Sequence, residues 1–150
     1  MVRNGQGEEV SFLDLATLAS APYWARRFAG AVLAAWQVLP DAITTAELLV
    51  SELVTNAIQA LAPESARLSY VDLEKVDSIR LTLRRLPGLV VIEVYDRDGR
   101  PPILSESDVD AESGRGLMLV QACSKEWGHF FHPSGGKTVY AVLMCDQGRC

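Results

Sequence analysis

The amino-acid sequence predicts a layered α+β fold, in which helices cover one face of a sheet built largely from antiparallel strands. Three observations lead to this prediction. Two segments with helical periodicity lie in the first half of the chain, and four strand-like segments follow them. The strand-like segments form two pairs joined by short Pro- and Gly-containing turns, as in β-hairpins. A length of 150 residues fits one domain, spanning residues 1–150, with a sizeable core.

The first elements are a short strand and a helix. Residues 1–9 are polar and form a loose end, whereas residues 10–18 alternate weakly and predict an edge strand. Ser20 and Pro22 are typical of a helix start, and this helix extends to about Gln37. Its apolar residues recur at helical spacing, which predicts a buried stripe that includes both tryptophans. The stripe comprises Trp24, Phe28, Ala31, Val32, Ala35 and Trp36.

The second helix follows a break at residues 39–41. It begins there or at Thr44, because the segment 44–47 also has the form of a capping box. Pro63 is expected to end it at about Leu61. Residues 63–77 show no pattern that assigns them to a helix or a strand.

Strand patterns dominate the second half of the chain. Alternation predicts a strand over 78–85, and a turn at 86–88 joins it to a second strand over 89–95. The stretch from Asp96 to Ser113 lacks a core-forming pattern, which is typical of a functional loop or a disordered one. A helix then begins at Gly114 and contains Cys123, which we expect in the core. The last hairpin pairs 127–131 with 138–144 around 133–136.

Composition excludes several classes of protein. The net charge is −5 and the basic residues are scattered, which argues against direct nucleic-acid binding. No segment is long and apolar enough to span a membrane, and the N-terminus does not resemble a signal peptide, so we expect a cytoplasmic protein. Three cysteines without a CxxC spacing argue against a disulfide framework and a structural zinc site. His129 and His132 point to opposite faces of a strand and predict no metal site.

Polar residues at three places indicate a ligand site. Glu52 and Asn56 share one face of an otherwise apolar helix, so they either hold a ligand or face water. Asp96 lies at the tip of a strand, where its carboxylate can accept a hydrogen bond from an amino group. The segment 114–116, Gly-Arg-Gly, precedes a helix, and its free N–H groups suit a phosphate. Each of these signals is weak by itself.

Taken in order, these motifs resemble the GHKL (histidine kinase-like) ATPase superfamily. The resemblance rests on Glu52–Ala57, the strand ending in Asp96, Gly114–Leu117 and Gly136–Tyr140, and covers about residues 20–144. It is greatest for the stand-alone anti-sigma factor serine kinases and related single-domain regulators. It implies a two-layer α/β sandwich of the Bergerat type, with helices on one face of a mixed, mostly antiparallel sheet. It also implies that the protein binds ATP and Mg²⁺.

The resemblance assigns a role to each matching position. Glu52 corresponds to the residue that polarises the attacking hydroxyl or water, and Asn56 to the ligand of a Mg²⁺ that bridges the phosphates. Asp96 corresponds to the acid that accepts a hydrogen bond from the exocyclic amine of adenine. Residues 100–113 would form a short lid. The remaining nucleotide contacts implied in this way are Gly99, Gly114, Arg115, Gly116, Leu117 and Thr138.

The sequence also departs from the family pattern. The first glycine box usually reads Asp-x-Gly-x-Gly, whereas residues 96–100 read Asp-Arg-Asp-Gly-Arg, with the single glycine, Gly99, displaced. Ala60 occupies a position that is often His in anti-sigma kinases.

Two functions remain open. One is a Mg·ATP-dependent serine/threonine kinase that phosphorylates an antagonist protein and alternates with binding of a sigma factor. The other is a catalytically weak or inactive module that regulates transcription by binding proteins. The Glu52 and Asn56 pair favours the first and the altered glycine box the second. The resemblance further suggests a homodimer.

Overall fold

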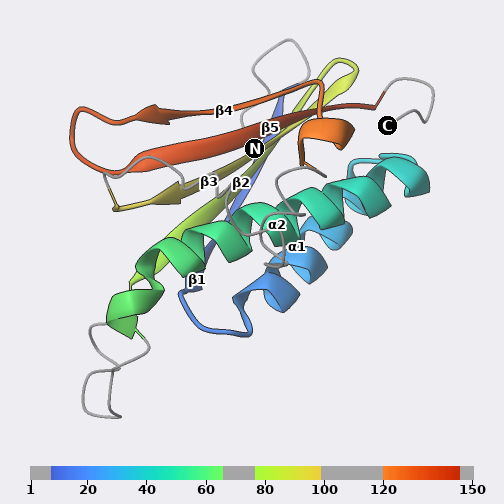
Figure 1. The fold of residues 1–150 in the computed structure, drawn as a ribbon. Coiled ribbons are helices and arrows are strands. Elements are labelled where there is room, and N and C mark those ends of the chain that lie inside the picture. The colour runs from blue at the N-terminus through green and yellow to red at the C-terminus, as the bar shows by residue number, and fades with distance from the viewer. Residues whose placement is uncertain (1–7, 66–76, 99–119, 146–150) are drawn as a thin grey trace.

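The computed structural model describes residues 8–65, 77–98 and 120–145. In this part of the chain, five strands form one sheet and two long helices cover one of its faces (Figure 1). The predicted α+β layered fold and order of elements are therefore confirmed, with a helical turn over residues 120–123 preceding the last hairpin. The elements are β1 (Glu9–Ala16), α1 (Ala21–Ala35), α2 (Pro40–Ser65), β2 (Ser78–Leu86), β3 (Leu89–Asp96), β4 (Glu126–Phe131) and β5 (Lys137–Met144).

The sheet has the strand order β1-β2-β3-β5-β4. All four neighbouring pairs are antiparallel, so the described strands contain no parallel pair of the kind that a mixed sheet would have. β1 lies at one edge, as its weak alternation predicted. The β3–β5 pairing joins two hairpins that are far apart in sequence, and it places Asp96 directly opposite Lys137.

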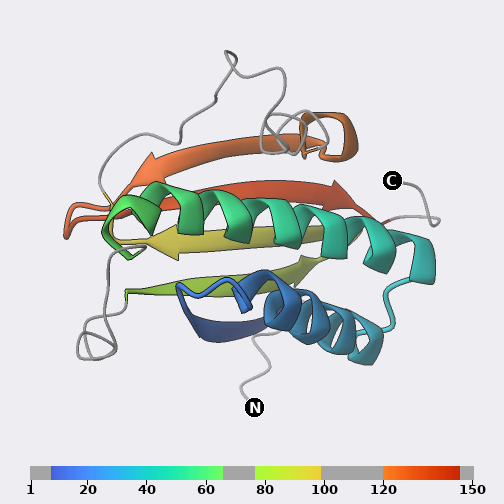
Figure 2. The ribbon, with the colours of Figure 1, turned by 60° about the horizontal axis from the view of Figure 1, so that its bottom comes forward.

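The core lies between the sheet and the helices. α2 packs across β3 and β5, and α1 lies beside it over the β1 side of the sheet (Figure 2). Alternate residues of β3 are buried against α2, while the intervening residues lie on the face that no described helix covers. The buried side chains of α2 recur at helical spacing and include Ala42, Ala46, Leu49, Val50, Leu53, Val54 and Ala57.

The buried face of α1 differs from the predicted one. Ala21, Ala25, Ala29 and Leu33 form it, and each is at most 2% exposed. Small side chains at every fourth position allow α1 to approach α2 closely, and bulky aromatic side chains on that face would hold the helices apart. Trp24 is consequently 54% exposed, so its predicted core position is wrong. Ala31 and Ala35 of the predicted stripe are also exposed, while Phe28, Val32 and Trp36 pack at the margin of the core.

The second helix begins at Pro40, the earlier of the two predicted starts, and its C-terminal end lies beyond the predicted one. α2 extends to Ser65 and therefore includes Pro63. A proline lacks the N–H that would bond to the carbonyl four residues earlier, but near a helix end this removes one hydrogen bond and leaves room for a final turn. Pro40 occupies the helix start, where a missing N–H costs nothing. No helix within the described ranges is long and apolar enough to cross a membrane.

Candidate functional site

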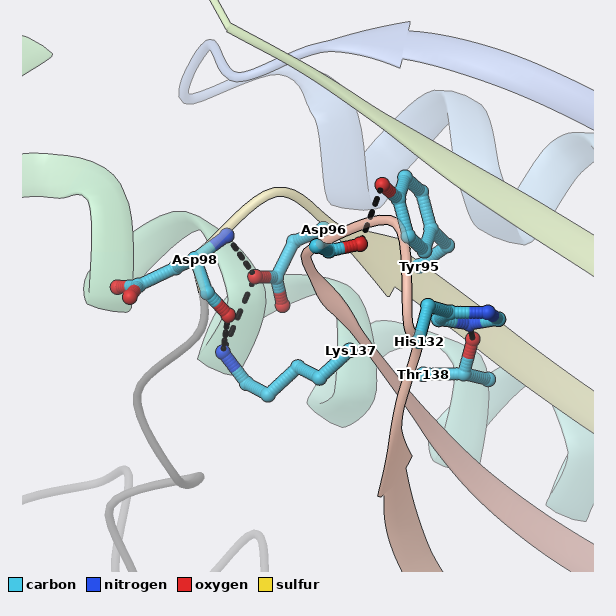
Figure 3. A network of polar contacts seen from close by, with 7 residues as sticks. Tyr95, Asp96, Asp98, His132, Lys137 and Thr138 are labelled. Carbon is cyan, nitrogen blue, oxygen red and sulfur yellow. Dashed lines mark hydrogen bonds and ion pairs between the residues drawn. The ribbon is translucent and has the colours of Figure 1, made fainter.

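The ends of β3 and β5 hold a buried ion pair. Asp96 is the last residue of β3 and Lys137 is the first residue of β5. The Lys137 Nζ atom lies 3.0 Å from Asp96 Oδ1, and the two side chains are 2% and 1% exposed (Figure 3). Because the two residues are register partners, both side chains project from the sheet on the face that α2 covers.

The chain after β3 folds back onto this pair. The backbone N–H of Asp98 donates a hydrogen bond to Asp96 Oδ1 at 2.8 Å, in the manner of an Asx turn. The backbone carbonyl of Asp98 accepts a hydrogen bond from Lys137 Nζ at 3.0 Å. Asp96 Oδ1 therefore receives two donors, and two of the three ammonium protons of Lys137 have acceptors (Figure 3).

The second carboxylate oxygen of Asp96 has no such partner. Oδ2 is buried, and no donor among the described residues reaches it. Burial raises the pKa of Asp96 above its ordinary value of 3.8, although Lys137 acts in the opposite direction. A buried acceptor without a donor costs about 1–3 kcal/mol. An amino group of a ligand would remove this cost, so the oxygen fits the exocyclic amine that the resemblance assigned to Asp96.

A glycine makes the close approach of β5 to β3 possible. Gly136 has φ +82°, and a Cβ at this position would lie 2.6 Å from the Asp96 carbonyl oxygen and 2.7 Å from the Tyr95 hydroxyl. Any other residue would collide with the backbone of Asp96 and would also be strained by the positive φ. Gly136 therefore fixes Lys137, its neighbour in sequence, against Asp96.

Glu52 and Asn56 lie on one flank of α2, and both are half-buried. The opposite flank faces α1, because Ser51 accepts a hydrogen bond from Arg26 Nη1 at 2.9 Å. At about 100° per residue, Asn56 is rotated by about 140° from Ser51 and so lies away from α1. Burial raises the pKa of Glu52 above its ordinary value of 4.5.

The C-terminal half of α2, which begins near Glu52, lies over the end of the sheet where β3 finishes and β5 starts (Figures 1 and 2). The structure therefore brings this half of the helix and Asp96 to the same end of the domain. Within the described residues, no three His, Cys, Asp or Glu side chains gather to hold a metal ion. A Mg²⁺ at Asn56 would need phosphate and water oxygens as its other ligands, as Mg²⁺ commonly has.

Thr138 does not lie beside Asp96. It follows Lys137 on β5 and therefore projects from the opposite face of the sheet. Its Oγ1 lies 2.7 Å from His132 Nε2, and the His132 ring packs edge-on against Tyr95 with centroids 5.2 Å apart (Figure 3). The structure therefore places Thr138 on the face of the sheet opposite to Asp96, and its contact with a nucleotide stays a prediction.

Lys137 is the β5 residue that lies beside Asp96, and it was not among the predicted site residues. The signal was present, because Lys137, Val139, Ala141 and Leu143 alternate on one face of β5. Extending the predicted strand by one residue would have placed Lys137 on the core side. The other predicted contacts lie outside the described residues; these are Gly99, Gly114, Arg115, Gly116 and Leu117.

Comparison with known proteins identifies the family of the chain. The sequence profile of the histidine kinase-like ATPase domain matches residues 15–143, which include every described element except the N-terminal part of β1 and the last residue of β5. No curated protein matches the chain.

Proposed function

This chain belongs to the histidine kinase-like ATPase family, and on that premise we propose that it is a Mg·ATP-dependent protein serine/threonine kinase. The family match supports ATP binding. The observation that carries the nucleotide site is the buried Oδ2 of Asp96, to which no residue in the described ranges donates a hydrogen bond. The proposed target is a serine or threonine of an antagonist protein, with a sigma factor as the alternative partner, as the resemblance implies.

The nucleotide is held at both of its ends in this proposal. Asp96 Oδ2 accepts a hydrogen bond from the N6 amine of adenine, which satisfies the buried oxygen. Asn56 offers an amide oxygen to a Mg²⁺ that the phosphates also bind, and this ion would neutralise charge on the phosphates. The two contacts lie at the same end of the domain, since the C-terminal half of α2 covers the end of β3 (Figure 2).

Glu52 acts as the base in phosphoryl transfer. The hydroxyl oxygen of the target bonds to the γ-phosphorus, the bond from that phosphorus to the bridging oxygen breaks, and ADP leaves with the electron pair. The hydroxyl proton passes to the Glu52 carboxylate. Partial burial, which raises the pKa of Glu52, increases its proton affinity and suits it to this role.

Substitutions on α2 test these roles. Asn56→Ala should abolish the Mg²⁺-dependent part of ATP binding, whereas Glu52→Ala should retain ATP binding and lose turnover. Gln59→Ala removes an exposed amide from the same helix and serves as the matched control, with binding and turnover unchanged. Calorimetry measures binding, and ADP release measures turnover. If Asn56→Ala and Glu52→Ala both match the control in a protein that binds and turns over ATP, the site assignment is wrong.

The alternative function is a nucleotide-binding module without kinase activity. The displaced Gly99 and the engagement of the Asp98 carbonyl by Lys137 favour it, because both alter the segment that follows Asp96 in sequence. In that case ATP binds and Asn56→Ala weakens it, but neither ADP nor a phosphorylated protein forms.

A further inference from the structure

Lys137 is buried in the nucleotide site, yet the roles given above to Glu52, Asn56 and Asp96 leave it without one. We propose that Lys137 is a specificity-determining residue, whose ammonium donates a hydrogen bond to the N1 ring nitrogen of the adenine that Asp96 holds. This inference rests on the proposed nucleotide site and adds the residue that reads a second atom of the base.

Within the part of the chain that the structure describes, the hydrogen bonds of the pair leave one donor and one acceptor unused. Lys137 Nζ donates to Asp96 Oδ1 and to the Asp98 carbonyl, each at 3.0 Å. An ammonium has three protons, and the third has no acceptor among the described residues. Asp96 Oδ2 has lone pairs and no donor in the same part of the chain. The buried pair therefore offers an acceptor and a donor side by side.

The Watson–Crick edge of adenine carries the complementary pattern. Its N6 amine is a donor and the adjacent N1 is an acceptor. With N6 on Asp96 Oδ2, N1 is the neighbouring atom that the ammonium can reach. A hydrogen bond from a charged donor is stronger than one from a neutral donor, and it is strengthened further in a buried site.

Burial explains why a lysine at this position needs a ligand. Residues that follow on the same face of β3 and β5 are apolar, with Val94 opposite Val139 and Ile92 opposite Ala141. A buried ion pair often stabilises a protein no better than apolar residues of the same volume. A pair whose second oxygen and third proton find no partner among the described residues stabilises the fold less than such a pair usually does. Recognition of a polar base edge supplies the missing partners for both atoms.

Analogues of ATP test the contact atom by atom. Calorimetric titration compares ATP, 1-deaza-ATP, in which C–H replaces N1, and 7-deaza-ATP, which retains N1 and is the matched control. Wild type should bind 1-deaza-ATP roughly tenfold more weakly than ATP or 7-deaza-ATP, the loss expected for one hydrogen bond to a charged group. Lys137→Met keeps the length of the side chain without the donor, and it should bind all three ligands with the same, weakened affinity.

The outcomes separate this inference from the function on which it rests. Tight ATP binding without discrimination at N1 in wild type overturns the role of Lys137 and leaves the nucleotide site intact. The same holds if Lys137→Met still discriminates at N1. Failure of wild type to bind ATP overturns the nucleotide site itself, and the role of Lys137 with it.

A second variant covers the possibility that Lys137→Met does not fold. The double variant Asp96→Asn/Lys137→Met leaves no uncompensated buried charge, and it should also bind ATP and 1-deaza-ATP equally. Tighter binding of GTP than of ATP by wild type overturns the inference as well, because guanine presents an N–H rather than an acceptor at N1.

Discussion

Lys137 and Asp96 face each other across the β3–β5 pairing, with Nζ 3.0 Å from Oδ1 and both side chains almost fully buried. Removing one member leaves the other charge buried without compensation, which costs about 3–5 kcal/mol. We therefore expect Asp96→Asn and Lys137→Met each to lower the free energy of unfolding by about that amount. The double variant should lose much less than the sum. Urea denaturation of the four proteins measures this coupling, and additive losses would contradict it.

Gly135 and Gly136 provide a matched pair of positions. Both have positive φ, but a Cβ at Gly135 meets no atom within 4 Å, whereas one at Gly136 meets the Asp96 carbonyl. We expect Gly135→Ala to cost about 1–2 kcal/mol from backbone strain. Gly136→Ala should cost about 1–3 kcal/mol more, because of the collision, and should weaken ATP binding as well. Equal losses of stability in denaturation curves would show that β5 does not need this close approach.

Glu52 gives the protein a pH-dependent stability. Its pKa in the folded protein is above the ordinary value of 4.5, so the folded state binds the proton more tightly than the unfolded state. Stability from this group is consequently present at low pH and is lost as pH rises through 4.5 and then the folded pKa.

Glu52→Gln removes this titration, so the variant should gain stability relative to wild type as pH rises through 4.5 and then through the folded pKa of Glu52. Chemical denaturation across that range measures the difference. If the difference in free energy of unfolding between the variant and wild type became smaller as pH rises, burial would not disfavour the charged form of Glu52. Loss of turnover in the same variant would show that the destabilising charge serves function.

The buried face of α1 predicts a small loss of stability for truncation of one large side chain and a large loss for another. Trp24 is 54% exposed, so Trp24→Ala should change the free energy of unfolding by about 0.5 kcal/mol or less. Leu33 is fully buried, and Leu33→Ala should cost about 2–5 kcal/mol. Thermal or urea unfolding measures the loss of stability in each variant. A larger loss of stability for Trp24→Ala than for Leu33→Ala would show that the aromatic stripe is the buried face of α1.

Sequence periodicity predicted most of the elements because their apolar alternation is regular. The strands 78–86 and 89–96 bury every second residue, so their bounds differ from the predicted ones by one residue. The buried face of α1 was harder to predict, because it consists mostly of alanines, which carry little hydrophobic signal beside Trp24 and Phe28. Which of two apolar stripes is buried depends on how closely α1 approaches α2, and that distance is a property of the packed domain.

Some residues of the candidate site could be predicted from the sequence and others could not. Asp96 was recognisable because a carboxylate ends an apolar strand, and Glu52 and Asn56 because they interrupt an apolar helix. Lys137 was not recognised, since a lysine before a strand ordinarily faces water. Its burial depends on the pairing of β3 with β5, which are separated by 40 residues, and the described part of these includes β4. Long-range register decides which face a strand residue occupies, and here it puts Lys137, rather than Thr138, on the same face as Asp96.

Titration of ATP into the wild-type protein, with and without Mg²⁺, tests the central claim most directly. We predict saturable binding at one site, strengthened by Mg²⁺ through Asn56, and weakened when Asp96 is replaced by Asn. Absence of heat or saturation up to millimolar ATP, in a folded protein and with Mg²⁺ present, would contradict the claim that this end of the sheet is a nucleotide site.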